Sequence, residues 1–372
     1  MSDKRKILFH INCLEHGGAE RVVSNLANKF AAEGYDVTVA VEWIGTNEYE
    51  LDPRISHVNV GLLKSDESKG RVSQYLTRIR RLRACIREVK PDIVIAFAHL
   101  AIYRALMAAC GMKVPVLISI RTNPAGHYDG RMDRYMIPLL FPGAAGCVFQ
   151  TTGQKEWFSP YLKDNCRIIL NPLSEKYVGV EPPKKRRKCV VHSGRIVDFK
   201  YQPMMVDAFM EVHEKHPDWS LELYGADSGD GTWEILTEKI KDYGAGDFVR
   251  LCGDSDSLET VLNDGGLYVF SSEWEGLPNA LMEAMALGLP IVSTDCPCGG
   301  PATLITDGVD GLLVPIKDKE ALAAGMLRLI EDRNLAERLG NNARRIVERA
   351  HPDVVHEQWA AYVEEIISSH KG

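Results

Sequence analysis

Two glutamates stand in an otherwise apolar stretch of the chain. In EWEGLPNALMEAMALGLPIVS, residues 273–293, seven residues separate Glu275 from Glu283. A charged carboxylate in apolar surroundings is costly unless a polar partner meets it. Carboxylates accept hydrogen bonds from vicinal hydroxyls, such as those of a ribose or a hexose. The pair is therefore either a helix-dipole carboxylate with a surface loop acid, or it binds a hydroxylated ligand.

The local pattern places both glutamates after one predicted strand. GLYVFSS has the composition of a strand, EWEGLP is the loop that follows, and NALMEAMAL is a short helix. Pro278 suits the first turn of that helix, and Gly288 ends it. Glu275 then lies in the loop and Glu283 on the helix, so that both can face one cleft.

Two cations form a second candidate site, after the predicted strand CVVHSG. In HSGRIVDFKYQP, Arg195 and Lys200 are five residues apart in a loop that precedes a helix. Arginine offers a bidentate fork to phosphate oxygens, and lysine offers a point charge. Either both side chains are solvated, or they bind a phosphorylated ligand.

A glycine pair forms the third candidate. In CLEHGGAER, Gly17 and Gly18 follow the first strand and precede a helix. Glycines there leave backbone N–H groups open, and a helix N-terminus carries partial positive charge. The segment is neither a G-x-G-x-x-G fingerprint nor a P-loop. It fits a plain tight turn as well as a loop that a diphosphate or a sugar approaches.

These three motifs lie in a chain that alternates strands with helices. The strand-like runs are KILFHIN, YDVTVAVEW, DIVIAF, VPVLISI and GCVFQ in the first half, and CVVHSG, WSLELYG, FVRLCG, GLYVFSS, LPIVSTD and GLLVP in the second. Such alternation predicts an α/β fold with parallel sheets covered by helices. Ligands of these sheets bind beyond the carboxyl ends of the strands, which is where the three motifs fall.

The chain divides at a segment rich in proline and lysine. Its 372 residues are typical of two domains. We expect Rossmann-like domains at 1–170 and 189–350, a linker at 171–188 and a terminal helix at 351–372. The linker ends in PPKKRRK, which fits either a solvated connection or a patch for nucleic acid or targeting.

Charge is distributed unevenly between the halves. Residues 1–170 hold 23 Lys and Arg against 17 Asp and Glu, whereas residues 171–372 hold 21 against 34. The first half is therefore expected to meet something anionic. The acidic second half argues against nucleic acid as a partner, because that binding depends on phosphate neutralisation.

The composition also indicates the compartment. The nine cysteines are scattered without a zinc spacing or a disulfide framework, and the pair in Cys296-Pro-Cys298 fits a turn better than a metal or redox site. Neither a membrane span nor a signal peptide is recognisable. We expect a cytoplasmic protein.

The positive charge of the first half is concentrated in one predicted helix. RVSQYLTRIRRLRACIREVK, residues 71–90, holds seven cations and one acid. Arg80, Arg83 and Arg87 share a face at i, i+3 and i+7. The pattern fits a solvated helix face, an anionic membrane surface or a phosphorylated substrate.

Taken together and in order, these motifs resemble the retaining glycosyltransferases of family 4. The resemblance rests on GGAER, GRIVDFK and SSEWEGLPNALMEAMALGLPIVSTD, and also on CGGPATLITDGVDGLLVP and the closing helix with Trp359. It covers nearly the whole chain. It implies the GT-B fold, in which two Rossmann-like domains face each other across a cleft and the terminal helix can pack back on the first domain.

The resemblance assigns roles to the two acids and their neighbours. Glu283 would bind the ribose hydroxyls of a nucleotide. Glu275 would hold the donor sugar, with help from backbone N–H groups at Gly276 and Leu277.

It likewise assigns the diphosphate of the donor to Arg195 and Lys200, with Gly17 and Gly18 reaching it from the opposite domain. Cations that face the departing phosphate stabilise the transition state more than the ground state. No metal or other cofactor is then required. In GDSDS the D-x-D acids fit a helix cap better than a metal site.

The sequence departs from the family pattern on the sugar side. Many relatives have histidine in the loop after VPVLISI, where this chain has Arg121, with Asn123 two residues on. His99, after DIVIAF, is an alternative sugar or acceptor contact or else a structural histidine. Tyr201 replaces a glycine that often follows the phosphate-binding lysine, so that this turn is expected to differ.

The expected function is retaining transfer of a hexose or N-acetylhexosamine from a nucleotide diphosphate sugar, by family habit a UDP-sugar, to a glycan. The acceptor would be polyprenyl-diphosphate-linked and held by the basic helix, at the inner face of a bacterial membrane during cell-envelope polysaccharide synthesis. The alternatives are a nucleotide-sugar epimerase of the same fold and a non-catalytic nucleotide-sugar binding module.

Overall fold

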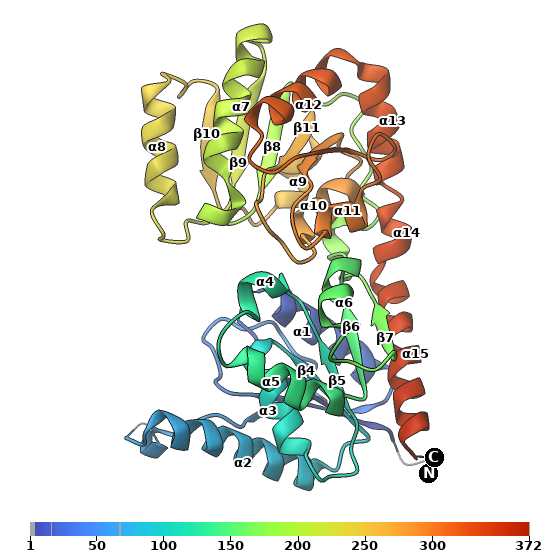
Figure 1. The fold of residues 1–372 in the computed structure, drawn as a ribbon. Coiled ribbons are helices and arrows are strands. Elements are labelled where there is room, and N and C mark those ends of the chain that lie inside the picture. Colours follow the sequence, from blue (N-terminus) through green and yellow to red (C-terminus); the bar gives the residue numbers. More distant parts are fainter. Residues whose placement is uncertain (1–3, 16, 67, 372) are drawn as a thin grey trace. The chain divides into compact units, whose positions relative to one another are not determined.

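The computed structural model describes residues 4–15, 17–66 and 68–371, which form two compact units. The first unit comprises residues 1–171 together with 353–372, and the second comprises residues 172–352 (Figure 1). The chain thus changes unit at the start of the expected linker and returns at the terminal helix.

The first unit is built on a parallel sheet of seven strands. In spatial order these are β3 (Ser56–Asn59), β2 (Asp36–Val41), β1 (Lys6–Ile11), β4 (Ile93–Phe97), β5 (Val116–Ser119), β6 (Gly146–Phe149) and β7 (Cys166–Ile168). The central strands are buried on both faces, as their unbroken apolar runs require. The strand order is that of a doubly wound Rossmann sheet.

Helices cover both faces of this sheet. They are α1 (Gly18–Ala32), α2 (Arg71–Val89), α3 (His99–Ala109), α4 (Pro124–His127), α5 (Asp133–Leu140) and α6 (Thr152–Phe158), joined by α15 (Pro352–Lys371). One apolar cluster contains side chains of α1 and α15, and a second contains side chains of α2, α3, α5 and α6. The sheet separates the two clusters.

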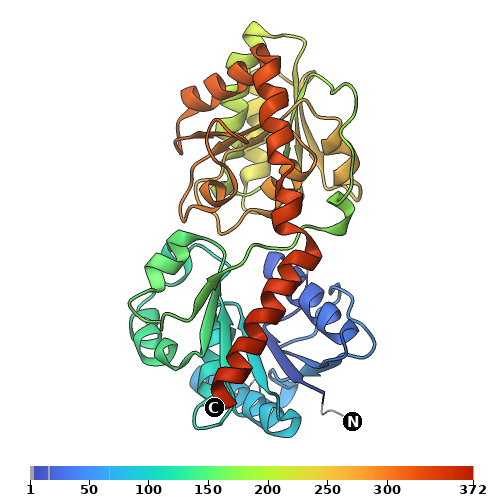
Figure 2. The ribbon, with the colours of Figure 1, turned by 90° about the vertical axis from the view of Figure 1, so that its right-hand side faces the viewer.

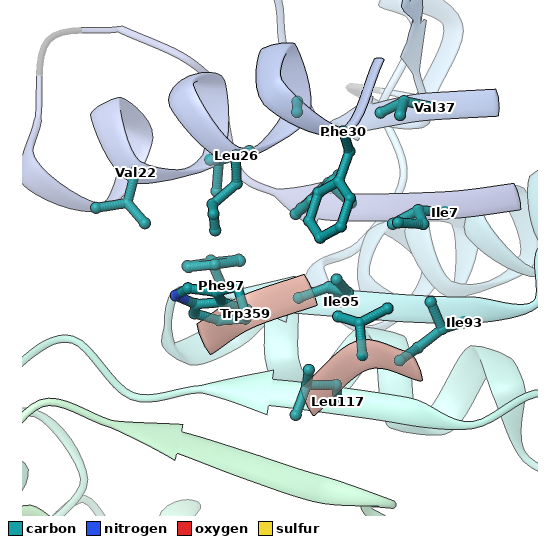
Figure 3. Close-up of a cluster of buried hydrophobic side chains, with 14 of the residues drawn as sticks. Ile7, Val22, Leu26, Phe30, Val37, Ile93, Ile95, Phe97, Leu117 and Trp359 are labelled. Carbon is teal, nitrogen blue, oxygen red and sulfur yellow. The ribbon is translucent and has the colours of Figure 1, made fainter. Parts of the chain in front are cut away.

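The terminal helix α15 completes the first cluster. Trp359 is fully buried, and its ring stacks on that of Phe97 in β4 with 5.7 Å between centroids (Figure 3). The red end of the chain runs along this unit in Figure 2. The His356 ring of this helix contacts the ring of Phe30 from α1, with 4.7 Å between centroids. The last helix is therefore an integral part of the first unit rather than a tail of the second.

The second unit repeats the architecture with six parallel strands. In spatial order these are β10 (Val249–Gly253), β9 (Ser220–Tyr224), β8 (Cys189–Ser193), β11 (Leu267–Phe270), β12 (Ile291–Thr294) and β13 (Leu312–Val314). Its helices are α7 (Gln202–Lys215), α8 (Thr232–Asp242), α9 (Leu258–Asn263), α10 (Asn279–Ala286), α11 (Gly300–Leu304), α12 (Lys319–Glu331), α13 (Arg333–Ala343) and α14 (Ile346–Ala350). The predicted α/β class with two Rossmann-like units is confirmed.

Two strands of the first sheet are not predicted from the sequence. The apolar runs predict β1, β2, β4, β5 and β6, but not β3 or β7 at the two edges. β3 is SHVN, with three of four residues exposed, and β7 is CRI, with two of three exposed. Such short polar strands owe their conformation to the neighbour that they pair with.

Replacement of Trp359 by alanine tests the role of α15. We expect the free energy of unfolding to fall by about 3–5 kcal/mol, because a large buried side chain leaves a cavity. Urea denaturation measures the change. Gln358→Ala, at an exposed position of the same helix, should change stability by less than about 0.5 kcal/mol. Equal effects of the two substitutions would contradict the packing role.

Candidate active site

The candidate residues of the second unit converge at the carboxyl edge of its sheet. Arg195 and Lys200 follow β8, and Glu275 follows β11, the strand beside β8. The chain runs from β8 through β9 to β10 on one side and then crosses to β11 on the other side of β8, so that the strand order reverses between β8 and β11. Open α/β sheets bind ligands in the crevice at such a point.

An ion pair lies at the centre of this site. Lys200 Nζ is 2.6 Å from Glu275 Oε1, and the side chains are only 12% and 15% exposed. Ser272 Oγ donates to the same carboxylate oxygen at 3.2 Å. The structure therefore brings together a cation and an acid whose chemistry is complementary to a phosphate and a hydroxyl.

Aromatic rings and backbone hydrogen bonds fix the lysine in place. Lys200 Nζ lies 5.0 Å from the ring centroid of Phe270, at the end of β11. The Ser271 hydroxyl donates to the Lys200 carbonyl at 2.7 Å, and the Glu273 amide donates to the Phe199 carbonyl at 2.8 Å. The loops after β8 and β11 are thereby joined, and the cation is pre-organised.

Glu283 belongs to the same electrostatic environment. It is 7% exposed and lies in α10. Burial raises the pKa of the Tyr268 phenol, and the charges of Glu283 and Glu275 raise it further. Both acids therefore act on one buried group, as expected for carboxylates that face a common region.

Arg195 differs from Lys200 in its surroundings. Its side chain is exposed and makes no ion pair with the described residues. Its loop is nevertheless fixed, because Gln202 Nε2 donates to the Arg195 carbonyl at 2.9 Å. Gly225 permits this loop, since a Cβ there would collide with the Gly194 carbonyl. A guanidinium on a fixed loop is available to an anion.

The turn at Tyr201 has a backbone conformation that glycine favours. Tyr201 has φ 55° and ψ 34°, a left-handed conformation that costs a non-glycine residue roughly 1–2 kcal/mol. Glycine adopts this conformation readily, and the expectation that the turn differs from that of the relatives stays a prediction. The Tyr201 ring lies 5.8 Å from Lys317 Nζ.

Backbone donors lie beside Glu275. Gly276 and Leu277 are buried, and neither amide donates to a backbone carbonyl within the described part of the chain. Gly300 packs against the Gly276 carbonyl so closely that a Cβ would not fit. The segment before α10 thus offers N–H groups where the resemblance places the donor sugar.

In the first unit, Gly17 and Gly18 begin α1. Gly17 is the N-cap and has extended backbone, with no side-chain cap. Burial raises the pKa of Glu20, while N–H groups of Glu20 and Ala19 lower it. A carboxylate of the chain itself therefore contacts the donors of the first turn.

His99 lies in a polar cluster after β4. His99 Nε2 is 2.6 Å from Asp133 Oδ1, and the Tyr103 hydroxyl donates to that same oxygen at 2.7 Å. The His99 ring also lies 4.3 Å from that of Tyr128. The side chain of His99 is 26% exposed. Asp133 orients the imidazole but was not a candidate from the sequence, because 34 residues separate it from His99.

Arg121 packs among aromatic rings rather than in open solvent. Its guanidinium lies 5.5 Å from the Trp359 ring centroid and donates to Asn171 Oδ1 at 2.6 Å. Burial lowers the pKa of Arg121 to about 9. Asn123 is buried and caps α4 by accepting from the Ala125 amide at 3.3 Å. Both side chains have structural partners, and their contacts with sugar or acceptor stay predictions.

Some cations of the basic helix α2 bind other groups of the protein, and others are exposed to solvent. Arg83 donates to the carbonyls of Ala108 and Cys110, each at 2.7 Å, at the end of α3. Arg80 and Arg87 are exposed. The arginines that bind buried acids elsewhere on the helix are Arg78, to Glu42, and Arg81, to Asp66. Arg80 and Arg87 thus remain available to a ligand, whereas Arg83 is committed to α3.

The D-x-D segment does not cap a helix. Ser257 is the N-cap of α9 and makes no side-chain cap hydrogen bond, while Asp254 Oδ1 accepts from the Ser255 amide at 3.1 Å. The expected capping role is wrong. Across the described ranges, no group of three or more His, Cys, Asp or Glu side chains has a geometry that could hold a metal ion.

Family comparisons match both halves of the chain. Residues 16–173 match the Glycosyltransferase Family 4 model, and residues 174–346 match the model of Glycosyl transferases group 1. The chain belongs to the glycosyltransferases of family 4 type with the GT-B fold, and glycosyltransferase activity follows from that membership.

Curated relatives align along the whole chain. A protein of Campylobacter jejuni named GalNAc-alpha-(1->4)-GalNAc-alpha-(1->3)-diNAcBac-PP-undecaprenol alpha-1,4-N-acetyl-D-galactosaminyltransferase is 24% identical over 97% of this chain and 99% of its own length. The amylovoran biosynthesis glycosyltransferase AmsD of Erwinia amylovora is 25% identical over 95% and 98%.

Solved structures show the same fold. The HepE protein of Anabaena in complex with UDP superposes with a TM-score of 0.83 at 17% identity, covering 97% of this chain and 100% of that one. TarM of S. aureus gives a TM-score of 0.75 at 16% identity, with 97% and 100% covered. In the described part of the present chain, no helix is both long enough and apolar enough to cross a membrane.

A double-mutant cycle tests the central ion pair. Lys200→Ala should lower the free energy of unfolding by about 1–3 kcal/mol, because Glu275 would remain largely buried without its cation. The effects of Lys200→Ala and Glu275→Ala on stability should differ in sum from the effect of the double variant by a coupling energy of about 0.5–3 kcal/mol. Arg195→Ala is the control and should leave stability unchanged. Strict additivity of the two single effects would show that the pair is not coupled.

Proposed function

We propose that the protein is a retaining glycosyltransferase that moves a hexose or N-acetylhexosamine from a nucleotide diphosphate sugar to a glycan. The observation that carries this proposal is the Lys200–Glu275 pair at the carboxyl edge of β8 and β11, with Glu283 in the same electrostatic environment. Family membership supplies the reaction type, and this geometry indicates how the donor is held.

The donor would replace the internal contact of the two charged groups. Its diphosphate binds Lys200 and the exposed Arg195, which frees Glu275 to accept hydrogen bonds from sugar hydroxyls. Amides at Gly276 and Leu277 contribute donors, and Glu283 binds the ribose. Because the loops that carry Arg195, Lys200 and Glu275 are held by hydrogen bonds, their backbones need little reorganisation on binding.

The reaction breaks the bond between the anomeric carbon and the diphosphate oxygen. Negative charge grows on the departing phosphate, where Lys200 and Arg195 stabilise it. The acceptor hydroxyl attacks from the face that the phosphate leaves, and its proton passes to that phosphate. An α-linked donor then yields an α-linked product, and the cations need no metal to assist them.

UDP is the proposed nucleotide and a lipid-linked glycan the proposed acceptor. HepE was solved with UDP, and the Campylobacter relative is named for a substrate linked to undecaprenol through a diphosphate. The AmsD relative is named for amylovoran biosynthesis. These names support a role in bacterial envelope polysaccharide synthesis.

The exposed cations of α2 suit the acceptor side. Arg80 and Arg87 face solvent on a helix whose position is fixed by Arg78, Arg81 and Arg83. An acceptor diphosphate or an anionic membrane surface would bind there, and each basic residue at such a surface adds roughly 1 kcal/mol. The protein would then work at the inner face of the membrane without spanning it.

Donor identity and turnover are measured together. In a thermal-shift panel of UDP-, GDP- and ADP-sugars, a UDP-sugar at 100 times its Kd should add about 2.7 kcal/mol of apparent stability. With that donor and a lipid-linked acceptor, Arg195→Ala should lower turnover by about 10²–10³-fold. Lys241→Ala, at an exposed position of α8, is the control.

The products separate the proposal from its rivals. Release of nucleoside diphosphate with an extended acceptor supports transfer. A new free nucleotide sugar would instead indicate an epimerase, and tight binding without turnover would indicate a binding module. Unchanged turnover in Arg195→Ala would reject its assignment to the diphosphate.

The role of α2 is measured with vesicles and acceptor. Arg80→Glu/Arg87→Glu should reduce sedimentation with phosphatidylglycerol vesicles and raise the KM for a lipid-diphosphate acceptor roughly tenfold or more, because charges near an anionic surface are reversed. Lys155→Glu/Lys163→Glu makes the same change in net charge at exposed positions elsewhere in this unit. Indistinguishable behaviour of the two double variants would contradict a local role of α2.

A further inference from the structure

A second cationic cleft lies at the amino edge of the second sheet. Its volume is about 660 Å³. The residues that line it precede the strands rather than follow them: the segment before β8, Trp219 before β9, Gly266 before β11 and Pro290 before β12. The catalytic site occupies the carboxyl edge of the same strands, so this cleft is separate from it.

The lining is strongly basic although the second half of the chain is acidic. Its charged side chains are Lys184, Lys185, Arg186, Arg187, Lys188 and Arg333, against one acid, Glu337. The KKRRK segment, which fitted a solvated linker, thus forms a wall of the cleft. A site that gathers cations in an acidic unit selects anionic ligands by local potential.

Some of these cations fix the segment that lines the cleft. Arg186 donates to the carbonyls of Asn263, Gly265 and Leu287, where α9 and α10 end. Burial, together with the neighbouring positive charge of Arg344, lowers the pKa of Arg186 to about 10.

Two more cations of the segment bind acids of the sheet region: Arg187 forms a bidentate pair with Glu222 at 3.0 Å, and Lys188 binds Asp218. The backbone of the segment is therefore fixed.

The remaining charge is uncommitted. Lys184, Lys185 and Arg333 are exposed and form no ion pair or side-chain hydrogen bond within the described ranges. Lys184 and Lys185 lie on the fixed segment, and Arg333 begins α13. Three free cations around one cleft match the several oxygens of a phosphate group.

An apolar surface adjoins these cations. Trp219 is partly exposed, and Gly266 makes room for its ring, since a Cβ would lie 2.9 Å from the ring carbon Cη2. Ile330 and Pro290 extend this surface within the lining. A flat or apolar group would lie here while a phosphate binds the cations.

We propose that this cleft is a second ligand site, which binds a phosphorylated molecule with a flat or apolar body. The shared chemistry is a phosphate on Lys184, Lys185 and Arg333 and a ring or chain against Trp219. A soluble phosphorylated metabolite and a phospholipid headgroup both have this chemistry. The site is independent of the proposed donor and acceptor.

Calorimetric titration with tripolyphosphate tests the phosphate part. All variants are made in the Arg195→Ala protein, the parent of this series, because tripolyphosphate also suits the candidate active site. Lys184→Ala/Lys185→Ala should weaken binding roughly tenfold, whereas Lys241→Ala/Arg250→Ala, an equal loss of exposed charge in the same unit, should not. Thermal unfolding checks that both variants fold. No binding by the parent, or equal binding by the two variants, overturns the proposal.

Two further probes identify the source of the ligand. Adenosine triphosphate should bind more tightly than tripolyphosphate, and Trp219→Leu should remove that difference; equal binding of the two probes would reject the apolar part. Sedimentation with phosphatidylglycerol vesicles separates the sources. If Lys184→Ala/Lys185→Ala loses sedimentation and Lys241→Ala/Arg250→Ala keeps it, the ligand is a lipid headgroup. If Lys184→Ala/Lys185→Ala keeps sedimentation but loses tripolyphosphate binding, the ligand is soluble.

Discussion

The candidate active site depends on one ion pair, between Lys200 and Glu275. Two charges that are largely removed from water are stable only when each has a partner, and here each supplies the other. The pair holds in place a cation that suits a phosphate and an acid that suits hydroxyl groups while no ligand is bound. In the proposed function, the donor would supply a phosphate for the lysine and hydroxyls for the glutamate. The site is therefore neutral overall without a ligand and matches a ligand that is charged at one end and hydroxylated at the other.

The position of this pair follows from the sheet. In a parallel sheet all carboxyl ends meet at one edge, and the reversal of strand order between β8 and β11 leaves a crevice there. The loop after β8 is joined to the loop after β11 by the hydrogen bonds of Ser271 and Glu273. Tyr201 shows how strictly the loop is determined, because its backbone keeps a left-handed conformation that its side chain disfavours.

Periodicity and motif order were sufficient to predict the fold class, the inner strands and the grouping of Lys200 with Glu275 in one site. They were insufficient where a contact joins residues that are distant in the sequence. The edge strands β3 and β7 have too few apolar residues to be recognised. The His99–Asp133 pair spans two helices, and the division of the α2 arginines between buried acids and solvent depends on residues outside that helix. Local sequence patterns contain no information about these distant partners.

Charge distribution shows why net charge alone is a poor guide to ligands. Residues 171–372 hold 34 acids against 21 cations, yet cations gather at both edges of the second sheet. Arg195 and Lys200 lie at the carboxyl edge, and Lys184 and Lys185 at the amino edge. At physiological ionic strength the potential of an exposed charge decays over about 8 Å. A phosphate in either place therefore meets mainly the nearby cations, and distant surface acids repel it weakly. Local arrangement, rather than the sum over the unit, decides which anions can bind.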